Sequence, residues 1–389
     1  MVDKMDFYKA KDLVFFKTGK LDSNAAEVGG IYPFFTCSQE TYAINSYAFD
    51  TECVLLAGNN ATGVFPLKYY KGKFNAYQRT YVIQALDKNI INIKYFYYFL
   101  RPLLKAFQQQ STGATTKFLT IKILHNLHVR LPSIDVQNKI VAILSAYDDL
   151  IDNNKKRIQI LENIAEELYK EWFVRFRFPN WENTEFKKGI PKNWSYTTLE
   201  CLGKIRTGKT PSTSNIEFYG GEYPFYKTPD MHDKVFVFDT DETLTDQGLN
   251  SQKSQIIEEN AIMVTCIGTG GVTAISTKKG CTNQQINSLS VTNNKFLYWA
   301  YYSIKNLKPQ IELYGASGAT MTNLSKGKFS NLQLVKPNDE LIEKYFDIVY
   351  PKFEMIKKLS QINKTLTEQK DSLLPCLISG KLSVEDLDI

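Results

Sequence analysis

The chain has 389 residues, 43% of them hydrophobic, which is enough for two domains with packed cores. Its formal net charge of +6 permits binding to nucleic acid but does not require it, since an ordinary slightly basic enzyme carries a similar charge. The six cysteines form no C-x-x-C pair and the three histidines have no ligand spacing, which argues against a structural zinc site and for a reduced, cytoplasmic compartment.

Targeting and membrane segments are not expected either. Residues 1–6 contain no apolar stretch of the kind that a signal peptide needs. No run of about 18 apolar residues occurs in the sequence, so we expect no membrane span.

The first predicted domain covers residues 1–132 and mixes strands with helices. Residues 54–56 form a short apolar run of the kind found in buried strands. Residues 95–107 have the apolar face of a helix. The mixture predicts an α/β (α+β) domain.

A long helix is predicted next, within a segment that we place at residues 133–178. Neither proline nor glycine occurs between Pro132 and Phe173. Apolar residues recur at steps of four and three from Ile140 to Trp172, which is a heptad seam, and Asn154 interrupts it. A polar residue in a seam can fix the register of paired helices.

The second half of the chain repeats this order. A second α/β domain is predicted at residues 179–337, with a buried strand at residues 261–264 and a helix at residues 296–305. A second helix follows within residues 338–389.

The seam of this second helix contains three polar residues, Lys352, Asn363 and Lys370. Two seams of matched length favour two long antiparallel helices that pair as a coiled coil. The alternative is two independent amphipathic helices, each packed on its own domain.

The repeated order reflects an internal duplication. Residues 111–115 recur as residues 316–320, and the glycines at the centre, Gly113 and Gly318, are 205 residues apart. The same separation relates Leu119 to Leu324, Asn126 to Asn331, Leu127 to Leu332, Pro132 to Pro337, Leu161 to Leu366 and Leu168 to Leu373. A constant offset over this span indicates a repeated unit.

Upstream of these residues the offset varies, as loops of unequal length would produce. The expected matches are Thr18–Lys20 with Thr207–Lys209, Gly30–Phe34 with Gly221–Phe225, Gly63 with Gly271, Gly72 with Gly280, and Gln78 with Gln285. The second copy is longer by about 17 residues, which we place around residues 230–252. The two copies are therefore expected to share a scaffold but not a surface.

Two glycine-containing segments resemble ligand-binding loops. Residues 203–210 match the pattern G-x-x-x-x-G-K-[ST], but a phosphate-binding loop needs a helix after its lysine, and residues 211–215 are typical of a turn. We expect a repeated turn in which Lys20 and Lys209 can touch phosphate. Gly268–Gly271 is interpreted as a tight loop after a strand rather than as a cofactor loop.

Polar and basic residues recur beside strands in both copies. Arg, Asn and Gln match the donors and acceptors of base edges in the major groove of DNA, and interleaved Lys and Tyr suit phosphate contacts. The alternative for each residue is a solvated turn. The predicted DNA contacts are Lys20, Asn59, Asn60, Lys68, Tyr70, Gln78, Arg79, Lys117, Arg206, Lys209, Lys227, Thr269, Gln284, Gln285 and Lys326.

Two segments carry a resemblance to a known family. The helix endings Leu161–Phe173 and Thr365–Gly380 resemble the conserved regions of the specificity (S) subunit of type I restriction–modification systems, which act in phage defence. The Gly-x-Tyr-Pro-Phe and Ser/Thr-Gly-Ala-Thr sequences support the resemblance, which covers nearly the whole chain.

The resemblance implies a non-catalytic subunit that binds double-stranded DNA. Each target-recognition domain would read one half of a bipartite, asymmetric site, while the helices set the spacer and dock two modification (methyltransferase) subunits. S-adenosylmethionine, ATP and Mg would be bound by these and by restriction/translocase subunits, and no cofactor or metal by this chain. Two alternatives remain, a self-contained DNA methyltransferase or nuclease and a DNA-free coiled-coil scaffold.

Overall fold

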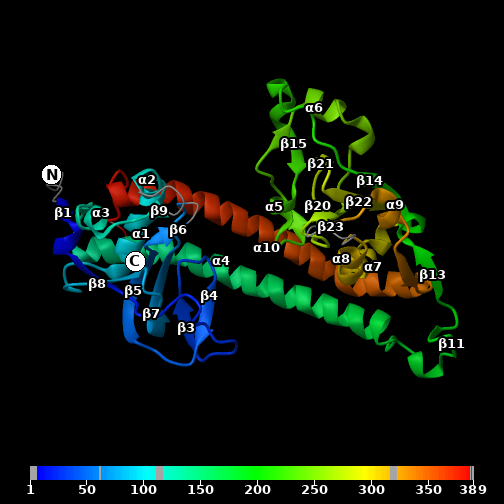
Figure 1. Ribbon diagram of the computed structural model, residues 1–389, viewed down its shortest axis with the longest axis horizontal. Coiled ribbons are helices and arrows are strands. Elements are labelled where there is room, and N and C mark those ends of the chain that lie inside the picture. The colour runs from blue at the N-terminus through cyan, green and yellow to red at the C-terminus, as the bar shows by residue number, and fades with distance from the viewer. Residues whose placement is uncertain (1–6, 61–62, 111–116, 316–321, 386, 388–389) are drawn as a thin grey trace. The chain divides into compact units, whose positions relative to one another are not determined.

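The computed structural model describes residues 7–60, 63–110, 117–315, 322–385 and 387 (Figure 1). The chain divides into two compact units. Unit 1 comprises Met1–Asn153 and Asn363–Ile389, and unit 2 comprises Asn154–Ile362. Each unit holds one copy of the duplication together with part of both long helices. The expected division of the chain into residues 1–132, 133–178, 179–337 and 338–389 remains a prediction.

A six-stranded sheet forms the centre of the first copy, in the order β2-β8-β5-β7-β3-β4. Its strands are β2 (Val14–Thr18), β3 (Tyr32–Phe35), β4 (Thr41–Ile44), β5 (Phe49–Ala57), β7 (Leu67–Ala76) and β8 (Thr80–Ala85). The apolar run predicted as a strand lies in the buried part of β5, which confirms that prediction. The helix expected at residues 95–107 is split into α1 (Ile93–Leu100) and α2 (Leu104–Gln110) by a 3-10 turn that contains Pro102.

Shorter elements complete the first copy. They are β1 (Phe7–Lys9) paired with β10 (His128–Arg130), β6 (Asn59–Asn60) paired with β9 (Lys117–Phe118), and α3 (Ile121–His125). Apolar side chains of β5 and α1 form one buried cluster with residues of both long helices. The copy therefore shares its core with the helices.

The second copy is built from the same kinds of element. Its main sheet runs in the order β14-β22-β18-β20-β16 and a second sheet in the order β17-β15-β21. The strands are β11 (Phe186–Lys187), β12 (Ile190–Pro191), β13 (Ser195–Thr198), β14 (Gly203–Thr207), β15 (Tyr219–Tyr226), β16 (Phe236–Val237), β17 (Thr243–Leu244), β18 (Ile262–Thr265), β19 (Ile267–Gly268), β20 (Thr273–Ser276), β21 (Cys281–Thr282), β22 (Ile286–Val291), β23 (Thr322–Asn323) and β24 (Gln333–Lys336). The helices are α5 (Thr228–Met231), α6 (Asp246–Asn250), α7 (Leu297–Asn306), α8 (Lys308–Gly315) and α9 (Lys326–Ser330). The strand expected at residues 261–264 and the helix at residues 296–305 correspond to β18 and α7.

Equivalent hydrogen bonds confirm the duplication. The matching bonds, all of 2.9 Å, are Leu119 N to Gly58 O with Leu324 N to Cys266 O, and Asn126 Nδ2 to Lys122 O with Asn331 Nδ2 to Gly327 O. Strand pairing repeats as well, since β3 runs parallel to the end of β7 as β15 runs parallel to β21. The repeated segments at residues 111–115 and 316–320 lie outside the described residues.

Two of the predicted upstream matches are wrong by one or two residues. The amide of Gly58 donates to the carbonyl of Arg79, and the amide of its counterpart Cys266 donates to the carbonyl of Gln285. Arg79 therefore corresponds to Gln285, and the counterpart of Gln78 is Gln284 rather than Gln285. The sequence contains two adjacent glutamines, Gln284 and Gln285, that could each match Gln78, and only the backbone hydrogen bonds distinguish between them.

The match of Gly72 with Gly280 is wrong for a similar reason. In the second copy Gly280 forms a bridge with Ile257, and in the first copy the corresponding pair is Phe74 with Phe49 of β5. Gly280 therefore corresponds to Phe74 and not to Gly72. The identity of two glycines thus suggested a register that the strands do not adopt.

The repeated Thr-Gly-Lys segments lie at the ends of β2 and β14, and the turn predicted after the second segment is present at Ser212–Asn215. Gly19–Lys20 and Gly208–Lys209 themselves form no turn, so that part of the prediction is wrong. A Cβ on Gly19 would lie 1.8 Å from the carbonyl oxygen of Ala76. A Cβ on Gly208 would lie 2.1 Å from the carbonyl oxygen of Asn283. Glycine is therefore needed where two backbones approach closely. Residues 208–215 contain no helix that could cradle a phosphate.

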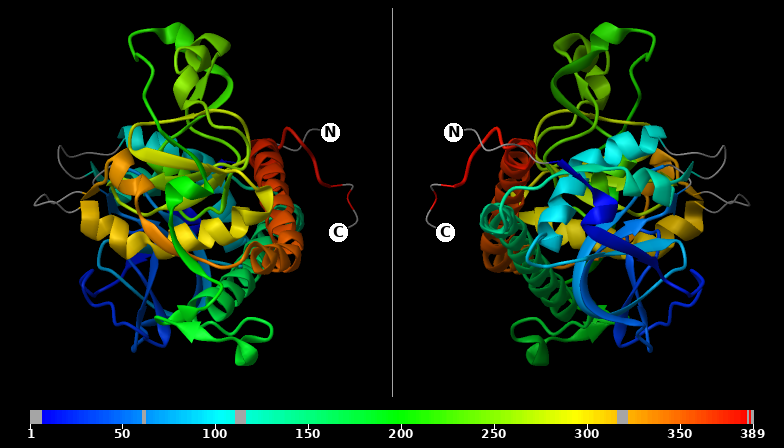
Figure 2. Two further views of the ribbon diagram at one scale, coloured as in Figure 1. Left: turned by 90° about the vertical axis from the view of Figure 1, so that its right-hand side faces the viewer. Right: turned by 90° about the vertical axis from the view of Figure 1, so that its left-hand side faces the viewer.

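The inserted residues of the second copy form additional structure. β16 adds an edge strand to the main sheet, and β17 pairs with β15 as β4 pairs with β3. In Figure 2 the green segment that includes β15 and α6 projects from the rest of unit 2. The insertion thus enlarges one edge of the domain and leaves the shared strands in place.

Both long helices are present: α4 (Ile134–Tyr169), extended by a π-helical turn at Lys170–Val174, and α10 (Asp339–Ser379). In unit 1 the Lys370 ammonium contacts Asp148, and Asn363 Nδ2 donates to the carbonyl of Ile151 at 3.4 Å. Asp148 of α4 contacts Lys370 of α10, whereas Ile151, which comes later in α4, contacts Asn363, which comes earlier in α10. The two helices are therefore antiparallel in this unit.

The helices also pair in unit 2. The Tyr345 hydroxyl donates to the carbonyl of Ala165 at 3.0 Å, and Ile158 and Leu161 pack against a cluster that includes Ile356. The alternative of two helices that pack only on their own domains is therefore wrong. The predicted fold class, two copies of an α/β domain with two long antiparallel helices, is confirmed.

Lys352 was predicted in the seam, and this is wrong. Phe353 takes the buried position and is 0% exposed, while Lys352 Nζ donates to the carbonyl of Ile348 at 2.7 Å. The heptad spacing of four and three residues did not distinguish position 352 from position 353. Lys370 does lie in the seam, because its side chain is only 6% exposed and its ammonium lies 2.6 Å from an Asp148 oxygen.

Candidate nucleic-acid interface

Several strands of the first copy end at the same place. Thr18 at the end of β2 pairs with Tyr81, and Ala57 at the end of β5 pairs with Thr80, both at the start of β8. The amide of Tyr77 donates to the carbonyl of Phe35 at the end of β3. The turn between β7 and β8 is thereby surrounded by the ends of β2, β3 and β5.

Six of the predicted contact residues gather around this turn, and we name them loop cluster 1. They are Lys20, Asn59, Asn60, Gln78, Arg79 and Lys117. Gln78 and Arg79 are exposed at the tip of the turn. Asn60 pairs with Lys117 between β6 and β9, and Leu21, next to Lys20, forms a bridge with Tyr77.

Contacts within loop cluster 1 hold its side chains in place. Gln78 Nε2 donates to Asp22 Oδ1 at 2.8 Å. The Arg79 guanidinium lies 5.4 Å from the centre of the Phe118 ring, an arrangement that leaves its edge N–H groups available to a ligand. The Cys37 thiol donates to Asn59 Oδ1 at 3.0 Å.

Lys68 and Tyr70 lie beside this cluster but are engaged within the protein. Lys68 Nζ donates to the carbonyl of Glu40 at 2.7 Å and sits over the Phe35 ring. Burial lowers the pKa of Lys68, and the Glu40 carboxylate partly opposes that shift. Tyr70 packs against Phe35 and Phe74. Both side chains therefore contribute to the packing of this end of the sheet.

The second copy gathers four predicted residues in the same way, and we name them loop cluster 2. They are Lys209, Thr269, Gln284 and Gln285. Lys209 N donates to the carbonyl of Thr282, and the Thr210 hydroxyl donates to Gln284 Oε1 at 2.6 Å. The Thr265 hydroxyl donates to the carbonyl of Thr269 and closes the tight loop that was predicted at Gly268–Gly271.

Three predicted residues are not brought into loop cluster 2. Arg206 extends along the sheet, with its guanidinium 3.5 Å from the Ser290 hydroxyl. Lys227 forms an ion pair with Glu242 at 2.7 Å. Lys326 begins α9 and is exposed.

Sequence reasoning missed the side chains that orient the cluster residues. Phe118 and Asp22 do so in the first copy, and Thr210 does so in the second. Thr210 and Asp22 follow the repeated Thr-Gly-Lys segment within two residues of its end, and this proximity was the available signal.

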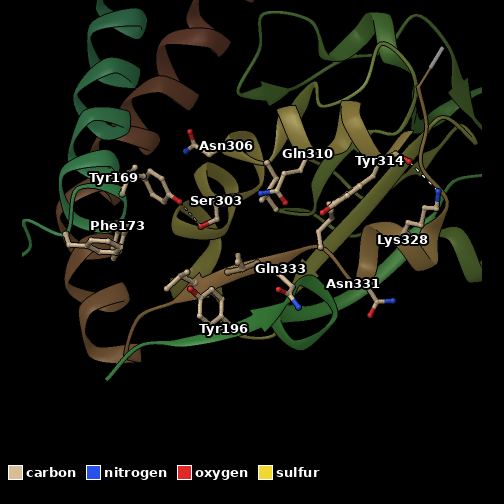
Figure 3. A pocket seen from close by; sticks show the side chains of 16 residues that line it. Tyr169, Phe173, Tyr196, Ser303, Asn306, Gln310, Tyr314, Lys328, Asn331 and Gln333 are labelled. Atoms are coloured by element: carbon tan, nitrogen blue, oxygen red, sulfur yellow. Dashed lines mark hydrogen bonds between the residues drawn. The ribbon is translucent and has the colours of Figure 1, made fainter. Parts of the chain in front are cut away.

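One cavity of unit 2 lies apart from loop cluster 2. Figure 3 shows a cavity in unit 2 where the Tyr169 hydroxyl donates to Ser303 Oγ at 3.1 Å. Its described lining has amide, hydroxyl and apolar side chains and one ammonium, that of Lys328, but no Asp, Glu, His or Cys. No residue of loop cluster 2 lines it.

Metal sites and membrane spans are absent from the described residues. No three His, Cys, Asp or Glu side chains among them come together as a possible metal site. None of the helices in this part of the chain has the length and apolarity that crossing a membrane requires.

The chain matches the family model described as "Type I restriction modification DNA specificity domain" at residues 2–163 and again at residues 191–371. Each match covers one copy of the duplication and part of the long helix that follows it. The chain belongs to the type I restriction–modification specificity subunits. The resemblance seen in the helix endings is thereby confirmed.

Similar specificity subunits occur in distant organisms. The chain is 32% identical over 336 residues to the type I restriction enzyme HindI specificity subunit of Haemophilus influenzae, which covers 70% of this chain and 73% of that relative. It is 29% identical over 318 residues to the MjaIX specificity subunit of Methanocaldococcus jannaschii, covering 78% and 72%.

A solved structure confirms the fold of this specificity subunit. The crystal structure of a type I restriction–modification S subunit from M. genitalium superposes with a TM-score of 0.64 over 97% of both chains, at 17% identity. At that identity the likeness concerns the fold, and the surface residues of the loop clusters have to be judged from this chain alone.

Proposed function

We propose that loop clusters 1 and 2 each read one half of a bipartite, asymmetric site in double-stranded DNA. The observation that carries the proposal is that the same strand ends recur in both copies with different side chains, Asn59 and Asn60 of β6 in one and Ile267 and Gly268 of β19 in the other. A shared scaffold with unequal loops is what two readers of unequal sequences need. Arg and Gln provide the hydrogen-bonding groups that distinguish bases in the major groove.

The lysines of the clusters have a different proposed role. Lys20 and Lys209 are exposed at equivalent strand ends and would contact phosphate, which positions the protein without selecting a sequence. Asn59, Asn60, Lys117 and Thr269 complete the proposed interface. Lys68, Tyr70, Arg206, Lys227 and Lys326 remain proposed contacts that lie outside the two clusters.

The proposal extends to partners and localisation. The chain would act in the cytoplasm without catalytic residues or bound cofactors, and two modification subunits would dock on α4 and α10. These subunits and the restriction/translocase subunits would bind S-adenosylmethionine, ATP and Mg.

The helices would also set the number of unread base pairs between the half-sites. The 36 residues of α4 span about 54 Å at ~1.5 Å per residue, which is comparable to one to two turns of duplex DNA.

Methylome sequencing of cells with and without the gene tests the proposal directly. The expected result is loss of one bipartite methylated sequence when the gene is removed. Methyl transfer by the purified chain alone would instead identify an enzyme. If the affinity of the complex for DNA depended on neither DNA sequence nor salt concentration, the alternative of a DNA-free coiled-coil scaffold would be supported.

Replacing Arg79 with alanine is expected to change recognition in one half-site only. Loss of a guanidinium that contacts a base edge should cost about 1–3 kcal/mol at that position. Binding of the assembled complex to duplexes that vary at each position measures the effect. Lys20→Ala is the matched control, since loss of a phosphate contact should weaken all duplexes alike. If Arg79→Ala also acts uniformly, Arg79 contacts phosphate.

Exchanging the second domain is expected to change one half-site and preserve the other. The structure places suitable junctions before Ser195 and after Lys336, where β13 and β24 pair and close the domain. The equivalent segment of another specificity subunit would replace residues 195–336 of this chain, and methylome sequencing would identify the new site. A change in both half-sites would contradict separate reading by the two clusters.

A further inference from the structure

The side-chain amide of Gln285 has a defined orientation, set by a short chain of hydrogen bonds. The backbone N–H of Gln285 donates to Asn283 Oδ1 at 3.2 Å. This bond fixes the amide of Asn283, whose Nδ2 then donates to Gln285 Oε1 at 3.1 Å. Because an amide nitrogen cannot accept a hydrogen bond, Gln285 must direct its oxygen, and not its nitrogen, toward Asn283 Nδ2.

A second donor occupies the same oxygen. The Thr228 hydroxyl donates to Gln285 Oε1 at 3.3 Å, from the first residue of α5. An amide oxygen has two lone pairs, so Asn283 and Thr228 together satisfy it. The acceptor of Gln285 is therefore used within the protein.

The nitrogen of Gln285 is left as the available group of a half-buried side chain. Gln285 Nε2 lies beside Gly268, where an added Cβ would be 3.9 Å away, and among the described residues the hydrogen bonds of this amide are those to its oxygen. The base of the loop is held in place, since Asn283 is 9% exposed and Cys266 N donates to the Gln285 carbonyl at 2.7 Å. Loop cluster 2 thus presents an oriented pair of N–H donors.

We infer that Gln285 reads a guanine in the half-site of the second domain, an inference that rests on the proposed function. Guanine offers two adjacent acceptors in the major groove, N7 and O6, which can take both hydrogens of one NH₂ group. The usual contact of glutamine with adenine needs the amide oxygen as well, to accept from adenine N6, and that oxygen is already satisfied.

The first copy is consistent with this inference. Its counterpart of Gln285 is Arg79, a side chain with N–H donors and no acceptor. Bidentate contact with guanine N7 and O6 is the commonest specific contact of arginine. Both domains therefore place a donor at the same point of the scaffold, and each half-site is expected to contain a guanine there.

Gln285→Glu in the complex with the modification subunits tests the assignment. Glutamate retains an oxygen for the Asn283 and Thr228 donors and replaces only the available NH₂ with a second oxygen. Methylome sequencing should show guanine replaced by cytosine at one position of one half-site, because cytosine N4 donates to a carboxylate. Gln333→Glu, which adds the same charge on exposed β24, is the control and should retain the original site.

A second measurement uses the unaltered protein, in case the variant fails to assemble. 7-Deazaguanine, placed in turn at each guanine of the half-site, keeps base pairing but removes the N7 acceptor, and binding should weaken about five- to tenfold at one of these positions. An unchanged site in Gln285→Glu, or unchanged binding to every 7-deazaguanine duplex, overturns the guanine assignment alone. A wild-type complex that methylates without any bipartite site overturns the proposed function itself.

Discussion

Asp148→Leu is expected to lower the free energy of unfolding by about 3 kcal/mol, because it leaves the Lys370 ammonium buried without its counter-ion. The Lys370 side chain is 6% exposed and its Nζ lies 2.6 Å from Asp148 Oδ1. The Tyr98 hydroxyl donates to the other carboxylate oxygen at 2.6 Å. Burial raises the pKa of Tyr98, and its bond to Asp148 raises it further, so the hydroxyl remains a donor.

Urea unfolding of the single and double variants measures this coupling. Asp148→Leu with Lys370→Leu should come back to within about 1 kcal/mol of wild type, since apolar side chains can replace a buried ion pair. Glu368→Ala is the control in the same unit, because its exposed pair with Lys364 at 3.8 Å should contribute less than about 0.5 kcal/mol. A double variant as unstable as Asp148→Leu would show that the pair is not coupled.

Inserting one heptad into each long helix is expected to lengthen the unread spacer. The insertions belong between Asn153 and Asn154 in α4 and between Ile362 and Asn363 in α10, where the chain passes from one unit to the other. Seven residues add about 10 Å to a helix and keep the seam, and this rise corresponds to about three base pairs. The twist of DNA, about 34° per base pair, favours a smaller change, so we expect one to three added base pairs.

Methylome sequencing reads the spacer and both half-sites at once. Both half-sites should keep their sequences, because neither loop cluster is altered. An active variant with an unchanged spacer would contradict the role of the helices as a ruler. The matched control inserts the heptad into α4 alone, which shifts the two seams out of register, and it should assemble poorly.

Much of the fold could be read from the sequence because its signals are local or periodic. The apolar run in β5 and the proline-free stretch of α4 are local, and the seam from Ile140 to Trp172 is periodic. The duplication could be recognised because loops of different length do not change the order of strands and helices in the two copies. The seam was less certain at Lys352, where the true core residue is its neighbour Phe353.

The candidate site was predicted only as a set of loops. Residues from the ends of β2, β5 and β7 meet because β2 and β5 both pair with β8 and because Gly19 lets two backbones approach closely. No pattern in the sequence encodes that closure, since it depends on pairing between distant strands. Lys227 and Arg206 looked equivalent to Lys209, and their contacts with Glu242 and Ser290 could not be foreseen.

By itself, the sequence determined the two-copy order of elements and the long helices, because these depend on periodicity or repetition along the chain, and the resemblance of the two helix endings indicated the family. The tertiary structure decided which residue of one copy corresponds to which residue of the other. It also decided that Lys370 is neutralised by Asp148 and that the oxygen of Gln285 is already satisfied. Hydrogen bonds and ion pairs depend on positions within a few ångströms, and residues far apart in the sequence reach such positions only in the folded chain.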